Sequence, residues 1–274
     1  MIDFLKAVLL GILEGITEWL PVSSTGHLLL LDEYLRLPLS DSFREIFLYV
    51  IQLGAVMAVA VLYGKKILPF RKKEKGEPLF AVFKKDVSLL WGKIALACVP
   101  GTVAALLFGE AVDRHLEKPD SIAVALIVYG IAFLWAEPLR QKRGVRVENV
   151  FQIGWKDALF IGFFQVLSIV PGTSRSGATI LGALLFGVSR TAAAEFTFFM
   201  AIPVMAGMSL IKIAENGLSF SVFEWLLLGA GTLSAFLTSL GAIRFLLSFV
   251  KKHSFAAFGV YRVFLGAAVL FYFR

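Results

Sequence analysis

Cysteine and charged residues are scarce in this sequence of 274 residues. The one cysteine, Cys98, excludes an internal disulfide scaffold. Charged residues make up 17% of the chain, against about 25% in a typical soluble domain. Apolar residues make up 58%, and the mean hydropathy is +0.80. This composition excludes a disordered chain and a nucleic-acid-binding protein, and it predicts an all-α protein that crosses the lipid bilayer several times.

Six apolar segments are long enough to cross a bilayer core of about 30 Å. They cover residues 46–63, 94–109, 121–137, 191–211, 225–249 and 254–273. Two further apolar segments, 4–31 and 158–189, are interrupted by PVSSTGH and PGTSRSG. Irregular backbone at membrane depth is tolerated only where protein or a water-filled cavity covers it. We therefore predict that each interrupted segment is a re-entrant hairpin, which enters and leaves the membrane on one side.

The loop charges predict the orientation. Loops 64–93, 138–157 and 250–253 together hold sixteen Lys and Arg residues, whereas loops 32–45, 110–120 and 212–224 hold five. The positive-inside rule places the first set in the cytoplasm and both termini outside it. The net charge of +7 is thus explained by cytoplasmic loops and is not evidence for nucleic-acid binding. Hairpins that crossed the membrane completely would give the same alternation. The short half-helices favour re-entry.

The two halves of the chain, 1–150 and 151–274, resemble each other. The stretch with Gly11, Glu14, Pro21, Ser24 and Gly26 matches the stretch with Gly162, Gln165, Pro171, Ser174 and Gly177, which has one extra residue. Each half holds one hairpin and three spans. Because three is odd, the halves are predicted to be inverted repeats, with the first hairpin open to the outside and the second to the inside.

Glu14 and Glu18 stand four residues apart, so a helix places both carboxylates on one face. Two carboxylates in an apolar setting repel each other and require a cation, shared protons or an aqueous cavity. A divalent metal ion such as Mg2+ or Ca2+ would satisfy both, which makes them candidate metal ligands. Alternatively, they form a polar pair in helix packing or lie exposed at the membrane surface.

The first break suits a phosphate group. Ser23, Ser24 and Thr25 offer hydroxyls, and Gly26 allows a tight turn into a half-helix whose free amides favour an anion. His27 can act as a general acid, a base or a nucleophile. The alternatives are hydroxyls that only cap the broken helices and a hydrogen-bonded core histidine.

The second break places Arg175 between Ser174 and Ser176, two residues after Thr173. An arginine at this depth is costly unless it meets an anion, and its planar donors match two phosphate oxygens. Alternatively, it forms a salt bridge with the carboxylates of the first hairpin. Both interactions are compatible if substrate opens a resting ion pair.

Three other charged residues lie in or at the spans. Arg262 is inside the last span, where it could snorkel to the surface, pair with a carboxylate or contact substrate. Glu45 and Glu195 begin spans, and we predict a solvated, interfacial position for both. Taken together, the carboxylates, hydroxyls, histidine and arginine are the groups that metal-assisted phosphoryl transfer uses, on a phosphate ester whose tail stays in lipid.

The stretches EGITEWLPVSSTGHL and PGTSRSGAT closely resemble the two signature stretches of the bacterial undecaprenyl-diphosphatase family, also called bacitracin-resistance proteins. The resemblance covers essentially the whole chain, including the C-terminal YR. It implies removal of one phosphate from undecaprenyl diphosphate, a polyprenyl diphosphate, to recycle the lipid carrier of peptidoglycan synthesis. It also implies a divalent cation, a site on the periplasmic side of the inner membrane and an inverted-repeat fold that forms a homodimer.

The resemblance also assigns roles to residues. The essential glutamate falls on Glu18, the histidine on His27 and the arginine on Arg175, and Ser24 is the favoured nucleophile with His27 as its rival. The expected substrate-binding residues are Glu14, Ser23, Thr25, Gly26, Thr173, Ser174, Ser176 and Arg262.

Two other functions compete with this one. The lipid phosphatases of the acid-phosphatase superfamily pair an S-R stretch with a histidine a few residues later, but Ser174 and Arg175 are followed by SGATILGALLFG, so that pattern fails. A transporter or lipid flippase would suit the inverted repeat and the broken helices equally well, because a fold does not determine function.

Overall fold

The computed structural model describes residues 1–70 and 83–273, without the side chains of residues 32 and 33. Four residues of the basic loop, Arg71, Lys72, Lys73 and Lys75, lie outside the described residues. Within the described part every named element is helical, apart from two isolated bridges. The helices are α1 (Ile2–Thr17), α2 (Ser24–Leu35), α3 (Asp41–Ile67), α4 (Lys85–Leu116), α5 (Pro119–Arg143), η2 (Val150–Gln152), α6 (Trp155–Val166), η3 (Leu167–Ile169), α7 (Arg175–Leu185), α8 (Arg190–Asn216), α9 (Val222–Lys252) and α10 (Ala256–Tyr272).

Five described helices, α3, α4, α5, α8 and α9, are long and apolar enough to cross a membrane. Each contains one of the predicted spans and extends beyond it at both ends. The sixth predicted span, 254–273, forms α10, which has 17 residues and is therefore roughly 26 Å long. The protein is thus a multi-pass membrane protein, and the helix at the sixth predicted span is shorter than the sequence predicted.

Both interrupted segments form two short helices joined by an irregular break. The first consists of α1 and α2, with 16 and 12 residues, and the second of α6 and α7, with 12 and 11. None of these reaches the roughly 20 residues that a spanning helix needs. We define the first break as residues 18–27 and the second break as residues 170–177, so that each includes the first residues of the helix that follows it.

The backbone of the two breaks corrects the predicted correspondence between them. Ser23 and Ser174 both have a left-handed conformation, with φ of 71° and 70°, and each directly precedes a helix. Ser24 therefore corresponds to Arg175 rather than to Ser174, and no extra residue is needed between Ser23 and Gly26. The sequence comparison aligned the prolines, whereas the backbone aligns the helix starts.

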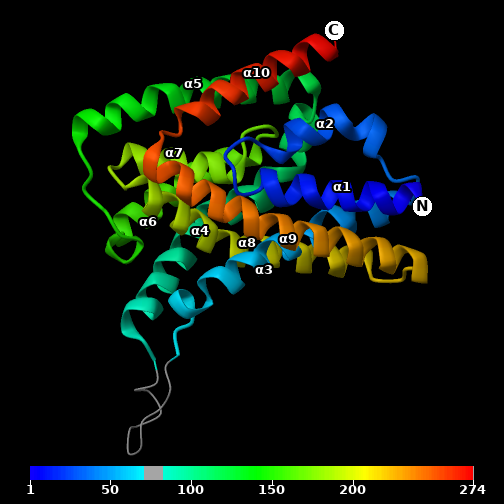
Figure 1. Ribbon diagram of the computed structural model, residues 1–274, viewed down its shortest axis with the longest axis horizontal. Helices are drawn as coiled ribbons and strands as arrows, with labels where there is room; N and C mark the ends of the chain where they lie inside the picture. The colour runs from blue at the N-terminus through cyan, green and yellow to red at the C-terminus, as the bar shows by residue number, and fades with distance from the viewer. Residues whose placement is uncertain (71–82, 274) are drawn as a thin grey trace, which may run out of the picture.

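Each hairpin packs against a long helix from the other half of the chain. Helix α1 lies along α9, and α6 packs against α4 (Figure 1). Glycines allow the close approach, because a Cβ atom on Gly11 would lie 2.2 Å from Gly231 O and one on Gly162 would lie 2.4 Å from Ala97 O. Helix α10 lies along α5 and also contacts α2 (Figure 1). These contacts bring the two breaks into the interior of the molecule.

An ion pair joins α3 and α8 at each end. Lys66 Nζ lies 2.7 Å from Glu195 Oε2, and Lys212 Nζ lies 2.8 Å from Glu45 Oε1. The start of each helix therefore meets the end of the other, so the two run antiparallel. The Glu45 side chain is 42% exposed, as an interfacial position predicts, whereas that of Glu195 is only 12% exposed. The prediction of a solvated Glu195 is wrong, because Lys66 and its helix cover the carboxylate.

Candidate active site

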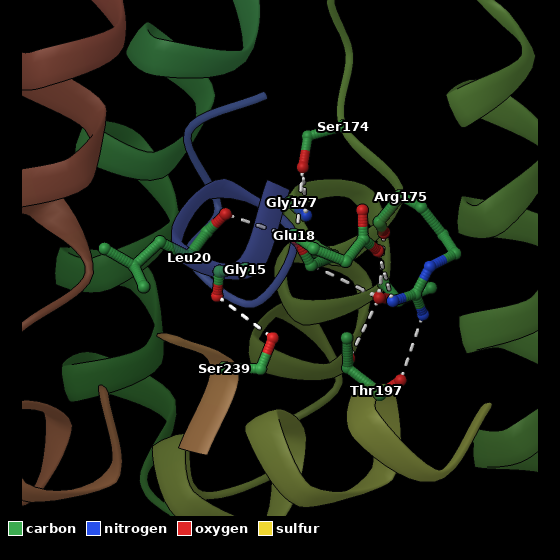
Figure 2. A network of polar contacts seen from close by, with 10 residues as sticks. Gly15, Glu18, Leu20, Ser174, Arg175, Gly177, Thr197 and Ser239 are labelled. Atoms are coloured by element: carbon green, nitrogen blue, oxygen red, sulfur yellow. Dashed lines mark hydrogen bonds and ion pairs between the residues drawn. The ribbon is translucent and has the colours of Figure 1, made fainter. Parts of the chain in front are cut away.

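The two hairpins meet where Arg175 contacts Glu18. Arg175 is the first residue of α7, and its Nη2 donates to Glu18 Oε1 at 2.9 Å (Figure 2). Its Nη1 donates to the backbone oxygen of Thr197 on α8 at 3.0 Å. Both charged side chains are about nine-tenths buried, with exposed fractions of 11% and 10%. The ion pair that the sequence offered as an alternative for Arg175 is therefore present.

Glu14 lies one turn before Glu18 on α1 and is 3% exposed. Its Oε1 is buried and has no hydrogen-bond partner. Among the described contacts Arg175 is paired with Glu18 and not with Glu14, so the second buried carboxylate leaves an excess negative charge that a proton or a further cation must balance. The described residues contain no group of three or more His, Cys, Asp or Glu side chains that could hold a metal ion. A metal ion at Glu14 and Glu18 would therefore need hydroxyl, carbonyl, water or phosphate oxygens as further ligands.

The first break ends in a hydroxyl cluster at the start of α2. Ser23 is 1% exposed and its Oγ has no hydrogen-bond partner, whereas Ser24 and Thr25 are half-buried. Gly26 is packed against α5, where a Cβ atom would lie 2.9 Å from Leu126 Cδ1. The helix thus begins with hydroxyls and with amides that have no intrahelical partner, which is an arrangement that suits an anion.

The second break is held by hydrogen bonds of its own side chains. Ser174 Oγ caps α7, because it accepts from the backbone N–H of Gly177 at 3.2 Å (Figure 2). It also lies 3.1 Å from Ser176 Oγ, which in turn donates to Leu20 O of the first break at 3.4 Å. Thr173 is completely buried, and its hydroxyl has no partner. The two breaks are therefore directly connected.

His27 is oriented by two hydrogen bonds. Its Nδ1 lies 2.7 Å from Ser23 O, and its Nε2 lies 2.6 Å from the hydroxyl of Tyr261 on α10. A carbonyl can only accept, so Nδ1 carries a proton, and Nε2 of the neutral ring accepts from the Tyr261 hydroxyl. Within the described contacts, none joins His27 to Glu18 or Arg175. Sequence reasoning missed Tyr261, whose only signal was its position in the C-terminal YR.

Arg262 on α10 is completely buried, which excludes snorkelling. Its Nη1 donates to Pro21 O at 3.2 Å, and its Nη2 donates to Gly172 O and Thr173 O, both at 2.9 Å. Its described hydrogen bonds are thus to backbone carbonyls of both breaks and not to a carboxylate.

Buried polar atoms without a partner gather among the predicted site residues. An unpaired buried donor or acceptor costs about 1–3 kcal/mol, so a folded protein keeps few of them without a reason. Five of those found in the described part of the chain belong to predicted site residues, namely Glu14 Oε1, Ser23 Oγ, Thr173 Oγ1, Arg175 Nε and Arg262 Nε. They come from both hairpins and from α10. This arrangement favours a polar ligand that bonds to groups of both halves.

Comparison with known proteins gives matches along almost the entire chain. The family model described as bacitracin resistance protein BacA matches residues 7–268. An undecaprenyl-diphosphatase of Enterococcus faecalis is 51% identical over 269 residues, which cover 98% of this chain and 96% of the relative. Undecaprenyl-diphosphatase 1 of Clostridium acetobutylicum is 47% identical over 273 residues, with 99% and 98% covered. The undecaprenyl-diphosphatase of Lachnoclostridium phytofermentans is 49% identical over 272 residues, with 99% and 97% covered.

Proposed function

The chain belongs to the bacitracin resistance protein BacA family, and we propose that it is a membrane phosphatase that hydrolyses undecaprenyl diphosphate to undecaprenyl phosphate and phosphate. The product is the lipid carrier that peptidoglycan synthesis reuses, and its recycling confers bacitracin resistance. The full-length similarity to proteins named undecaprenyl-diphosphatase supports this function. One structural observation supports an active site between the hairpins. Arg175 Nη2 of the second hairpin lies 2.9 Å from Glu18 Oε1 of the first, and both hairpins hold buried polar atoms without a partner.

Arg175 is positioned to bind the diphosphate. Its guanidinium now bonds to Glu18 and to Thr197 O, and a phosphate with two oxygens in the plane of the guanidinium would exchange with the carboxylate. The exchange frees Glu18 beside the phosphate. Thr173, Ser174 and Ser176 supply further hydroxyls from the second break.

Hydrolysis follows from the groups of the first break. In the favoured route Ser24 Oγ attacks the terminal phosphorus, the bridging P–O bond breaks, and undecaprenyl phosphate leaves. Nε2 of His27 exchanges its hydrogen bond with the Tyr261 hydroxyl for one with Ser24, takes the serine proton and returns it to the leaving oxygen. Water then releases phosphate from the serine. In the rival route Nε2 of His27 itself attacks. Ser23, Thr25 and Gly26 bind the phosphate through hydroxyl and amide groups.

Glu14 and Glu18 fit a divalent metal ion such as Mg2+ or Ca2+, because both are buried on one face and Glu14 Oε1 has no partner. When bound, the ion supplies positive charge that neutralises phosphate oxygens. The protein's own contribution is to hold the two carboxylates one turn apart, with Glu14 Oε1 free of a protein partner.

We further propose that the halves 1–150 and 151–274 are inverted repeats, each with one re-entrant hairpin and three spans. Three features support this: the matching left-handed serines, the packing of α1 on α9 and of α6 on α4, and the antiparallel ion pairs of α3 and α8. With the basic loops in the cytoplasm, both termini and the opening of the site face the periplasmic side of the inner membrane. We propose a homodimer on the basis of the family resemblance alone.

Phosphate release tests the function directly. Purified protein in detergent should release phosphate from undecaprenyl diphosphate. The release should stop when a chelator removes divalent ions and should resume when Mg2+ or Ca2+ is restored. The mirrored helix packing is also typical of transporters, so the same protein should be tested in vesicles for movement of a non-hydrolysable analogue. Analogue movement without any phosphate release from the diphosphate would contradict the proposed enzyme.

A further inference from the structure

Arg262 joins the two breaks through one guanidinium. Its hydrogen bonds go to Pro21 O in the first break and to Gly172 O and Thr173 O in the second, at distances of 3.2, 2.9 and 2.9 Å. These residues lie about half the chain apart in sequence, and Arg262 reaches them from a third place, α10. The breaks are therefore held together by a residue that belongs to neither hairpin.

Arg262 supplies hydrogen-bond donors to backbone carbonyls of the two breaks. A carbonyl in an irregular segment has no partner in a helix ladder, and at membrane depth water does not replace it. The planar guanidinium carries five N–H donors in a fixed geometry, so it can serve several carbonyls at once. The surroundings are tight, because a Cβ atom on Gly177 would lie 3.2 Å from Arg262 Nη1 and one on Gly172 would lie 2.6 Å from Ile122 O.

Tyr261, the preceding residue of α10, holds the imidazole of His27. Its hydroxyl lies 2.6 Å from Nε2, while Ser23 O holds Nδ1 at 2.7 Å. A phenol can donate to Nε2 when the imidazole is neutral and accept from it when it is protonated. Tyr261 can thus orient the ring before the proton transfer at Nε2 and after it.

We propose that α10 is the positioning element of the active site. Arg262 sets the separation of the two breaks, and Tyr261 orients His27, without contact between either residue and the substrate. This inference rests on the proposed function, because it assumes that groups of both breaks act on one diphosphate. It gives Arg262 a positioning role in place of the substrate contact that the sequence left open.

The first test compares Arg262→Lys with Arg244→Lys, a change at an exposed arginine on α9. Lysine keeps the charge but not the fork that serves both breaks, so kcat should fall on the order of 100-fold while KM changes by less than about threefold. The control should keep wild-type kinetics. A higher KM with unchanged kcat for Arg262→Lys would overturn the inference, because it indicates substrate contact.

The second test measures the separation of the hairpins without turnover. Ile16 and Leu167 are exposed residues just before the first break and within the segment that leads to the second, and each can carry a spin label on cysteine in a Cys98→Ala background. Arg262→Lys should shift or broaden the distance distribution between the labels, and Arg244→Lys should not. An unchanged distribution would overturn the positioning role, whereas absent phosphate release by wild-type protein would overturn only the proposed function.

The third test uses Tyr261→Phe, which removes one hydroxyl and keeps the ring, so it stays informative if Arg262→Lys does not fold. Loss of one neutral hydrogen bond should lower kcat about fivefold at unchanged KM. The chain has only three histidines, so the 15N signals of His27 can be identified with His27→Gln. The Nε2 signal should move in Tyr261→Phe and stay in Tyr34→Phe, an exposed tyrosine on α2. An unmoved Nε2 signal in Tyr261→Phe would overturn this part of the inference.

Discussion

The two breaks share a backbone and differ in what their side chains do. Each has a left-handed serine directly before a helix, Ser23 in the first and Ser174 in the second. The hydroxyl of Ser174 caps α7, whereas that of Ser23 is buried without a partner. The second break is therefore organised by its own hydrogen bonds, and the first keeps polar groups available. We infer that the second break presents Arg175 rigidly and that the first carries out the chemistry.

The largest effect should come from Glu18, the only described ion-pair partner of Arg175. Glu18→Gln keeps the size of the side chain but removes the charge, so turnover should fall at least about 1000-fold in a protein that still folds. Phosphate release from undecaprenyl diphosphate measures it, with Glu110→Gln, an exposed glutamate on α4, as control. Glu14→Gln should lose less activity and require more metal ion. Near wild-type turnover in Glu18→Gln would show that the Glu18 carboxylate is not required for the reaction.

Ser24→Ala and His27→Ala should separate the two nucleophiles of the first break. If Ser24 attacks phosphorus, Ser24→Ala should lose activity about 1000-fold, and a phosphoserine should accumulate on rapid quenching of wild type. If His27 attacks, Ser24→Ala keeps substantial activity and a phosphohistidine can be trapped. Mass spectrometry of quenched protein identifies the adduct, and a phosphohistidine would reverse the preference for Ser24.

Arg175→Lys should be nearly as damaging as Arg175→Ala. The guanidinium now bonds to Glu18 and to Thr197 O with separate nitrogens, which a single ammonium group cannot reproduce with a diphosphate in place. Loss of a bidentate contact in the transition state should cost about 3 kcal/mol, or about 100-fold in turnover. Both variants should be assayed in the same detergent. A lysine variant with most of its activity would mean that Arg175 supplies only positive potential.

The smallest effects should come from substitution of the two left-handed serines, Ser23 and Ser174. Ser174→Ala removes a helix cap and should destabilise the protein by about 1 kcal/mol, which lowers Tm by about 2–4 °C. Ser23→Ala removes a buried hydroxyl that has no partner, so Tm should stay or rise, while KM rises if the hydroxyl binds phosphate. Thermal unfolding in detergent followed by tryptophan fluorescence measures both. Equal losses of Tm would show that the two breaks are not organised differently.

Local patterns in the sequence predicted the helical membrane class, the long spans and both interruptions. Those features depend on composition and on runs of apolar residues, which are properties of neighbouring positions. The same reasoning identified Glu14, Glu18 and Arg175 as residues too costly to bury without a partner. It failed for Glu195, because a single neighbouring lysine on another helix decides whether a carboxylate at the end of a span is solvated.

Only the tertiary structure decided which groups meet. Arg175 and Glu18 are 157 residues apart, and Tyr261 lies 234 residues from His27, so no local spacing could pair them. The register of the breaks also came from the fold, since the left-handed serines and not the prolines mark where α2 and α7 begin. The sequence by itself determined which residues need a partner in the membrane. The packing of α10 and of the two hairpins determined which partner each of them has. Hydrogen bonds and ion pairs form between residues that are close in the folded chain, and these residues are far apart in the sequence.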